Sequence, residues 1–156
     1  MRTIIIYATK HGATKKIGEY IANRINNAVL HDIDSAATIS VSDYDCVVLG
    51  SPLTAGMIRR EIKNFAVNHT AELKSKRLGL FVSGLQKDGE AEYLKQNFPQ
   101  ELLDHAAAKA FLGGIFDPEG CGFVARKLIK AVAKIDAYTS TIDEEKINLF
   151  VQRLLC

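Results

Sequence analysis

The residues with the clearest chemical potential in this chain form a short run of hydroxyl, basic and small side chains, Thr-Lys-His-Gly-Ala-Thr at 9–14. An apolar run, Thr3–Ala8, comes before it, and apolar residues at helical spacing come after it, at Ile17, Ile21 and Ile25. The run therefore joins a strand to the first turn of a helix. Backbone N–H groups in such a turn have no partner within the helix, and the helix dipole makes that end positive. Because a phosphate satisfies both, the sequence predicts an anion site here.

We expect six consecutive residues to hold the anion: Thr9, Lys10, His11, Gly12, Ala13 and Thr14. The two threonine hydroxyls can donate hydrogen bonds, and Gly12 has no Cβ to keep the loop away from the anion. The run is neither a Walker A loop nor a GxGxxG fingerprint, since the required glycines and the Gly-Lys-Ser/Thr ending are missing. An alternative interpretation stays open, in which Thr14 is only a helix cap and Gly12 only a turn residue.

The elements that must position this loop alternate as strand and helix, which predicts an α/β fold with a parallel sheet covered by helices on both faces. Strands are expected near 3–8, 28–33, 46–50, 78–83 and 109–113. Helices are expected at about 14–26, 58–66, 90–98, 101–108 and 122–135, the last of these with Val124, Leu128, Val132 and Ile135 on one face. A final helix is expected to begin at a capping box, Thr141–Glu144.

Two strand orders are common for such a chain: a nucleotide-binding order that reverses after strand one, and the order 2-1-3-4-5. In either order the ligand lies beyond the carboxyl ends of the strands, where the order switches. The loops after strands one, three and four, at 9–14, 51–57 and 84–89, should therefore line one site. The ligand-binding residues expected around the second and third loops are Ser51, Pro52, Leu53, Thr54, Ala55, Gly56, Ser83, Gly84 and Leu85.

Composition bounds the class of protein. The chain has 156 residues, of which 47% are hydrophobic and 24% charged, so we expect one globular domain over 1–156. No apolar run is long enough to span a bilayer and the N-terminus does not look like a signal peptide. We therefore expect a cytoplasmic protein without a transmembrane segment, for which peripheral membrane contact stays open. A net charge of +2 gives no reason to expect nucleic acid as a partner.

The three cysteines, Cys46, Cys121 and Cys156, form no CxxC pair, which argues against a zinc site and against a disulfide framework. We expect Cys46 to pack inside a buried strand. Cys121 is either a small loop residue or a reactive thiol. No metal ligand and no catalytic residue is assigned.

At its loops the chain resembles the flavodoxin family. Residues 9–14 look like the family's Thr/Ser-x-x-Gly-x-Thr phosphate loop, and Leu49–Pro52 looks like its apolar-Gly-Ser-Pro/Ala loop after the third strand. The resemblance covers essentially the whole chain and implies a five-stranded sheet of order 2-1-3-4-5. The resemblance also implies one FMN at the switch point, where flavodoxins bind it. The resemblance puts the FMN phosphate at 9–14 and the flavin ring between Ser51–Gly56 and Ser83–Leu85.

Within the family, the branch of menaquinone-dependent protoporphyrinogen oxidases looks more similar than the acidic electron carriers. The similar stretches are 4–9, 44–51, 111–114 and 127–130, together with Thr141 and the closing helix. Two features depart from the relatives. The second and third loops carry Leu53, Met57 and Leu85 where electron carriers commonly offer aromatic rings to the flavin, and 115–122 lacks the Arg, Tyr or Trp that a tetrapyrrole would favour.

The resemblance implies an FMN-binding redox protein that transfers electrons through its flavin. An electron carrier with a redox partner protein and an FMN-dependent oxidoreductase acting on a quinone or another small molecule both stay open. A flavin-free interaction module is the third possibility. Because stacked aromatics and clustered acids disfavour added negative charge, their absence predicts a flavin that is easier to reduce than in acidic flavodoxins. The oligomeric state is not predicted.

Overall fold

The central sheet follows the expected strand order. The computed structural model describes residues 1–86, 88–120, 122–133 and 137–156. Its sheet has the order β2-β1-β3-β5-β6, with all neighbours parallel, and β4 is added antiparallel to β3. The strands are β1 Thr3–Tyr7, β2 Ala28–Asp32, β3 Cys46–Thr54, β4 Met57–Ile58, β5 Arg77–Ser83 and β6 Ala108–Phe111. The order 2-1-3-4-5 is thereby confirmed for the five parallel strands, and the alternative order is excluded.

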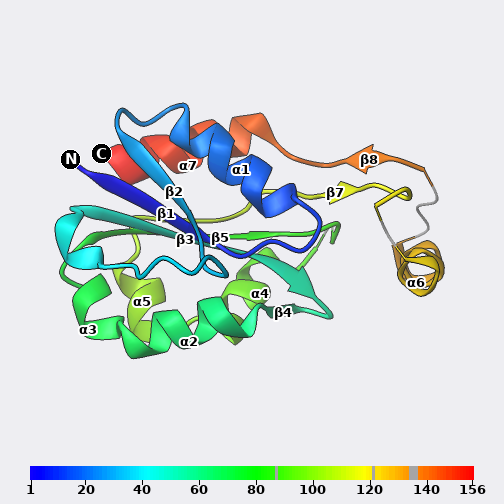
Figure 1. Ribbon diagram of the computed structural model, residues 1–156, viewed down its shortest axis with the longest axis horizontal. Helices are drawn as coiled ribbons and strands as arrows, with labels where there is room; N and C mark the ends of the chain where they lie inside the picture. The colour runs from blue at the N-terminus through cyan, green and yellow to red at the C-terminus, as the bar shows by residue number, and fades with distance from the viewer. Residues whose placement is uncertain (87, 121, 134–136) are drawn as a thin grey trace.

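Helices cover both faces of the sheet, as the alternating pattern predicts (Figure 1). One face is covered by α1 Ala13–Ala22 and α7 Glu144–Leu155. The other face carries α2 Arg60–Asn68, α3 Thr70–Leu73, α4 Glu90–Asn97 and α5 Gln100–His105. A short 3-10 turn, Val41–Asp43, leads into β3. None of the helices in the described part of the chain combines the length and the hydropathy needed to cross a membrane.

The inner strands β1, β3 and β5 are largely apolar on both sides, because helices bury both sides of them. Ile5 points toward α1 and α7, where it joins Ile17 and Phe150, whereas Ile4 belongs to the core on the opposite face. The glycine in α1, Gly18, marks a close approach of the helix to the sheet. A Cβ on Gly18 would lie 2.9 Å from a methyl carbon of Leu30 on β2. The helix therefore sits directly on the sheet, which fixes the position of its first turn.

The third strand is longer than the sequence indicated. The prediction that 51–57 is a loop was wrong for 51–54 and for Met57, because β3 continues to Thr54 and turns back antiparallel into β4. Ala55 and Gly56 make the turn with φ of 50° and 78°. Two positive φ values suit a tight hairpin turn, and Gly56 adopts its value without strain. The residues expected to contact a ligand thus form a hairpin at the carboxyl edge of the sheet.

The start of α7 differs from the expected capping box. Asp143 is the N-cap, and its Oδ1 accepts a hydrogen bond of 3.0 Å from the N–H of Lys146. Thr141 instead accepts a hydrogen bond of 3.1 Å from the N–H of Gly114. The hydroxyl proposed as the cap therefore joins two loops, and the cap lies two residues later.

A two-stranded ribbon, β7 Ile115–Phe116 and β8 Thr139–Ser140, leaves the sheet after β6 and carries α6 Phe123–Ala133 away from the main body (Figure 1). The sequence predicted this helix but not the ribbon. The apolar residues Val124 and Leu128 are 79% and 64% exposed, so this part of the helix does not cover the sheet. The expected thiol at Cys121 and the helical position Ile135 lie outside the described residues. That 1–156 form one domain stays a prediction.

Candidate functional site

The three loops expected to form one site meet at the carboxyl edge of the sheet. β1 lies between β2 and β3, so the order reverses on either side of it. The Ala8 N–H donates to the Gly50 carbonyl oxygen at 3.0 Å, which joins the end of β1 to β3. The Thr14 and Ser83 hydroxyl oxygens are 2.7 Å apart, which joins the first turn of α1 to the end of β5. The structure thus brings the predicted loops together.

The first loop ends in a helix turn built for an anion. Gly12 is the residue before α1, with a φ of 91°, and its carbonyl accepts the N–H of Lys16 at 3.0 Å. The N–H groups of Ala13, Thr14 and Lys15 lie in the first turn, where the helix has no carbonyl to accept them. A Cβ on Gly12 would meet nothing within 4 Å, so the space over the turn is open. The first turn carries no acidic residue, which leaves its positive dipole uncompensated.

Two threonine hydroxyls expected at the anion already have partners. Thr9 Oγ1 accepts a hydrogen bond of 3.0 Å from the N–H of Gly12, which closes the loop on itself. Thr14 and Ser83 are both buried, and their hydroxyls bond each other. A hydroxyl has one donor and two acceptor sites, so Thr14 can still donate to an anion while it accepts from Ser83. Its expected role as a phosphate ligand stays a prediction.

A cation that the sequence analysis did not assign lies beside the first loop. Arg59 donates from Nη1 to the Thr9 carbonyl oxygen at 3.3 Å, and its guanidinium is 3.1 Å from a carboxylate oxygen of both Asp34 and Glu61. The hydrogen bond to Glu61 is the main cause that raises the pKa of Arg59. The backbone N–H of Arg59 also donates to Ser51 Oγ at 2.8 Å. Arg59 therefore links the first loop to the β3–β4 hairpin.

Hydrogen bonds from Asn97, which the sequence did not single out, hold the hairpin. This buried side chain accepts from the Ile58 N–H at 2.9 Å through Oδ1. Its Nδ2 donates to the carbonyl oxygens of Gly56 at 2.8 Å and Tyr93 at 2.7 Å. An Asn at the end of an amphipathic helix, between the buried Leu94 and Phe98, was the available signal. Its hydrogen bonds hold the β3–β4 hairpin directly.

An aromatic ring lies between the second and third loops, although neither loop supplies it. A Cβ on Gly56 would lie 3.4 Å from the Tyr93 ring, and a Cβ on Gly89 would lie 3.3 Å from it. Tyr93 comes from α4, and its ring centroid is 6.5 Å from that of Phe111. Neither loop carries an aromatic residue of its own, but the fold brings Tyr93 to their junction.

The third loop contains a buried acceptor for which the described residues supply no donor. Gln86 Oε1 is buried and has no hydrogen-bond partner among the described residues. It points back at Gly84, where a Cβ would lie 2.1 Å from it. Gln86 lines a cavity of about 190 Å³ with Leu85, Gly113 and Lys146, and with Phe111, Thr141 and Asp143. An unpaired buried acceptor is costly, so this loop is suited to a ligand that offers an N–H.

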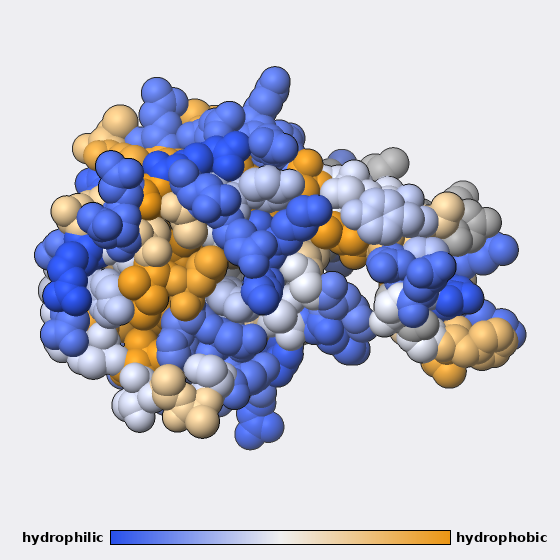
Figure 2. Space-filling model, turned by 45° about the horizontal axis from the view of Figure 1, so that its top comes forward, coloured by the Kyte–Doolittle hydropathy of each residue, from blue (hydrophilic) through white to orange (hydrophobic). Residues whose placement is uncertain are grey.

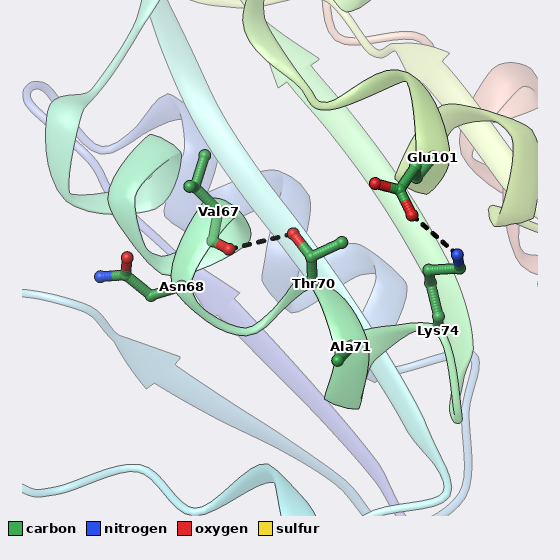
Figure 3. Close-up of a pocket in the computed structure, with 6 residues that line it drawn as sticks. All are labelled: Val67, Asn68, Thr70, Ala71, Lys74 and Glu101. Atoms are coloured by element: carbon green, nitrogen blue, oxygen red, sulfur yellow. Dashed lines mark hydrogen bonds and ion pairs between the residues drawn. The ribbon is translucent and has the colours of Figure 1, made fainter.

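A larger hollow lies elsewhere on the molecule, and no residue of the three loops lines it. It has a volume of about 590 Å³ and is lined by Val67, Asn68, Thr70, Ala71, Lys74 and Glu101 (Figure 3). Lys74 Nζ and Glu101 Oε2 pair at 2.8 Å, and Thr70 donates to the Val67 carbonyl oxygen at 3.0 Å. The helices that form it end just before β5 and β6 begin, so it lies at the amino edge of the sheet, away from the three loops.

The comparison with protein families decides the classification. A model described as "Flavodoxin domain" matches residues 4–143. The chain belongs to the flavodoxin family. Among solved structures of the same fold, oxidised flavodoxin 1 from Bacillus cereus is 15% identical with a TM-score of 0.59, covering 99% of this chain and 97% of that one. A short-chain flavodoxin associated with a bacterial microcompartment is 18% identical with a TM-score of 0.62, at the same coverage.

Curated relatives of this flavodoxin-family chain are distant. Protoporphyrinogen IX dehydrogenase [quinone] of Escherichia coli K12 is 24% identical over 132 residues, covering 82% of this chain and 70% of that protein. Phospholipase A1 of Dinoponera quadriceps is 25% identical over 132 residues, covering 83% of this chain. The chain spans only 29% of the length of that phospholipase. The resemblance to the flavodoxin family, and to its protoporphyrinogen-oxidising branch, is confirmed.

The residues at the site fit FMN, the cofactor that membership of the flavodoxin family supports. The open first turn of α1 matches the phosphate in charge and in hydrogen-bond donors. Gln86 Oε1, which has no partner among the described residues, could accept the N–H that a flavin offers at its pyrimidine edge. Lys10, Lys15 and Lys16 are exposed at or next to the first loop and add positive charge.

Proposed function

We propose that this member of the flavodoxin family binds one FMN and transfers electrons through it. The observation that carries the proposal is the uncapped, cationic first turn of α1, placed at the switch point between β1 and β3. An anion there would satisfy the N–H groups of the turn and the helix dipole together. A flavin attached to that anion would lie along the carboxyl edge, where the hairpin and the third loop begin.

In this proposal the protein binds and orients the cofactor, and FMN supplies reversible electron uptake when bound. The N–H groups from Lys10 to Thr14 hold the phosphate, with the Thr9 and Thr14 hydroxyls beside them. Ser51–Gly56 lies along one side of the ring, kept in shape by Asn97 and Arg59. Ser83–Leu85 lies along the other side. No acid or base from the protein is required for electron transfer.

The alternative is an enzyme that uses the same cofactor on a small molecule. The specific support is the 24% identity over 132 residues to protoporphyrinogen IX dehydrogenase [quinone] of Escherichia coli, which makes a quinone the first acceptor to test. A flavin-free module is the third reading of the fold. A cytoplasmic location stays a prediction from the sequence.

The absorption spectrum of the purified protein tests flavin binding. A yellow protein that releases FMN on heating, identified by chromatography against riboflavin and FAD, supports the proposal. A colourless protein that stays colourless after incubation with FMN and desalting contradicts it and leaves the flavin-free module.

Turnover separates a carrier from an enzyme. A carrier is reduced by a flavodoxin reductase and reoxidised slowly by free quinone. An oxidoreductase oxidises its own donor with steady turnover when quinone is present. Protoporphyrinogen is the donor to try first, because it tests the branch that the sequence resembles.

A further inference from the structure

The projecting helix α6 is the part of the molecule that the flavin site does not explain. It stands at the end of the β7–β8 ribbon, clear of the sheet and of the helices that cover it (Figure 1). Helices of globular proteins normally bury an apolar stripe against the core. Here Val124 and Leu128 are among the most exposed large apolar side chains of the described residues, and Phe123 beside them is 70% exposed.

The charges of α6 are all of one sign. Arg126, Lys127 and Lys130 are its only charged residues, and Phe123–Ala133 contains no acidic residue. At 3.6 residues per turn, Val124 and Leu128 share one side of the helix. Arg126, Lys127 and Lys130 share the opposite side, together with Phe123. Figure 2 shows hydrophobic and hydrophilic surface next to each other on the projecting lobe.

Local contacts hold two of the basic side chains in place. Lys127 Nζ lies 4.7 Å from the centroid of the Phe123 ring, a cation–π contact. Arg126 donates to the Pro118 carbonyl oxygen, which ties the helix to the turn before it. The helix therefore presents an apolar side and, opposite it, a cationic side.

We propose that α6 docks on the surface of an anionic lipid bilayer. A helix with apolar residues on one side and Lys and Arg on the other lies in the interface, with its apolar side among the upper acyl chains and its cations at the headgroups. The charge of the helix complements anionic headgroups, and each cation adds to the attraction. A bilayer surface suits α6 because the helix combines exposed apolar side chains with charges that are all positive.

The orientation of the docked protein follows from the place where the β7–β8 ribbon leaves the sheet. The ribbon begins just after β6 ends, at the same edge as the loops around Thr14 and Ser83 (Figure 1). Docking through α6 therefore turns this edge toward the bilayer. The proposal does not depend on FMN, and it stands or falls separately from the proposed function.

Vesicle binding of the full chain is the first test. The protein should sediment with vesicles of phosphatidylglycerol and phosphatidylcholine and stay in solution with phosphatidylcholine alone. Lys127→Gln with Lys130→Gln should weaken the binding by about fivefold for each cation lost. Lys95→Gln with Arg153→Gln removes the same charge from exposed positions on α4 and α7 and should leave binding unchanged. Val124→Ser with Leu128→Ser should weaken it by about tenfold or more.

A tryptophan reporter places the helix at the lipid directly, because the chain contains no Trp. The fluorescence of the Val124→Trp protein should shift to shorter wavelength when anionic vesicles are added. Val67→Trp, at a 55% exposed position on α2, should show no shift and is the matched control.

Three outcomes would overturn the proposal. One is the absence of binding to anionic vesicles by a protein with a native circular dichroism spectrum. Another is equal binding by the α6 variants and the control pair. The third is a concentration-dependent dimer that forms without lipid and is lost in Val124→Ser with Leu128→Ser, because α6 would then dock on a second copy of the chain.

Discussion

The hydroxyl of Thr14 lies 2.7 Å from the hydroxyl of Ser83, and both side chains are buried. This contact joins the first turn of α1, where the phosphate is proposed to bind, to the end of β5, where the third loop begins. The two residues are 69 positions apart in the sequence. The contact links the first loop to the third loop, and the proposed flavin would lie across both.

Thr14→Val tests that link, because valine keeps the shape of threonine and removes the hydroxyl. Ser83 Oγ would then be buried without its partner, which should lower the free energy of unfolding by about 1–3 kcal/mol. Thr38→Val, at an exposed position, is the control and should change little. Chemical denaturation measures both. In a double-mutant cycle with Ser83→Ala the two effects should not add, and strict additivity would show that the hydroxyls do not interact.

Replacing Asn97 should weaken flavin binding, although Asn97 itself is not proposed to contact the flavin. Asn97→Leu removes the bonds to Ile58 and Gly56 and leaves buried backbone groups of the hairpin unpaired, at a cost of about 1–3 kcal/mol in the free energy of unfolding. Asn68→Leu, on the exposed side of α2, is the matched control. Fluorescence titration with FMN should show weaker binding for Asn97→Leu alone. Unchanged affinity in a folded Asn97→Leu protein would mean that the hairpin does not contact the flavin.

Gly113 should tolerate no side chain. Its φ is 84°, and a Cβ there would lie 1.9 Å from the Thr141 carbonyl oxygen. Gly113→Ala should therefore lower the melting temperature strongly or prevent folding, because the backbone of Gly113 or of Thr141 would have to move. Gly122→Ala, where a Cβ meets nothing within 4 Å, should melt within a few degrees of the parent protein. Similar melting temperatures for the two variants would contradict the packing described here.

Cys46 should make stability fall at alkaline pH. Burial raises the pKa of its thiol from 9.0 to about 11. A pKa raised in the folded state stabilises the fold below pH 9, and that contribution is lost as pH rises toward 11. The free energy of unfolding should therefore fall by about 2 kcal/mol more over this range than in Cys46→Val. Parallel pH profiles for the two proteins would show that the thiol is not held neutral by burial.

Much of the fold could be predicted from the sequence because its signals are local. The apolar run before Thr9 and the periodic run after Thr14 define a strand and a helix wherever they occur. Arg59 and Asn97 could not be assigned, since their partners lie in other elements and no spacing records such contacts. The amphipathic pattern of α6 was visible as a helix, but a periodic apolar face is the same whether a sheet or nothing covers it. The hairpin after Gly50 was missed because Ser51, Pro52 and Thr54 are more typical of a loop than of a strand.

Calorimetric titration of the flavin-free protein with FMN and with riboflavin tests the central claim most directly. Riboflavin carries the same ring and lacks the phosphate that the first turn of α1 is proposed to hold. We expect one FMN to bind per chain and riboflavin to bind at least about a hundredfold more weakly, a difference of about 2.7 kcal/mol. Equal affinities for the two flavins, or no binding of FMN, would contradict the account.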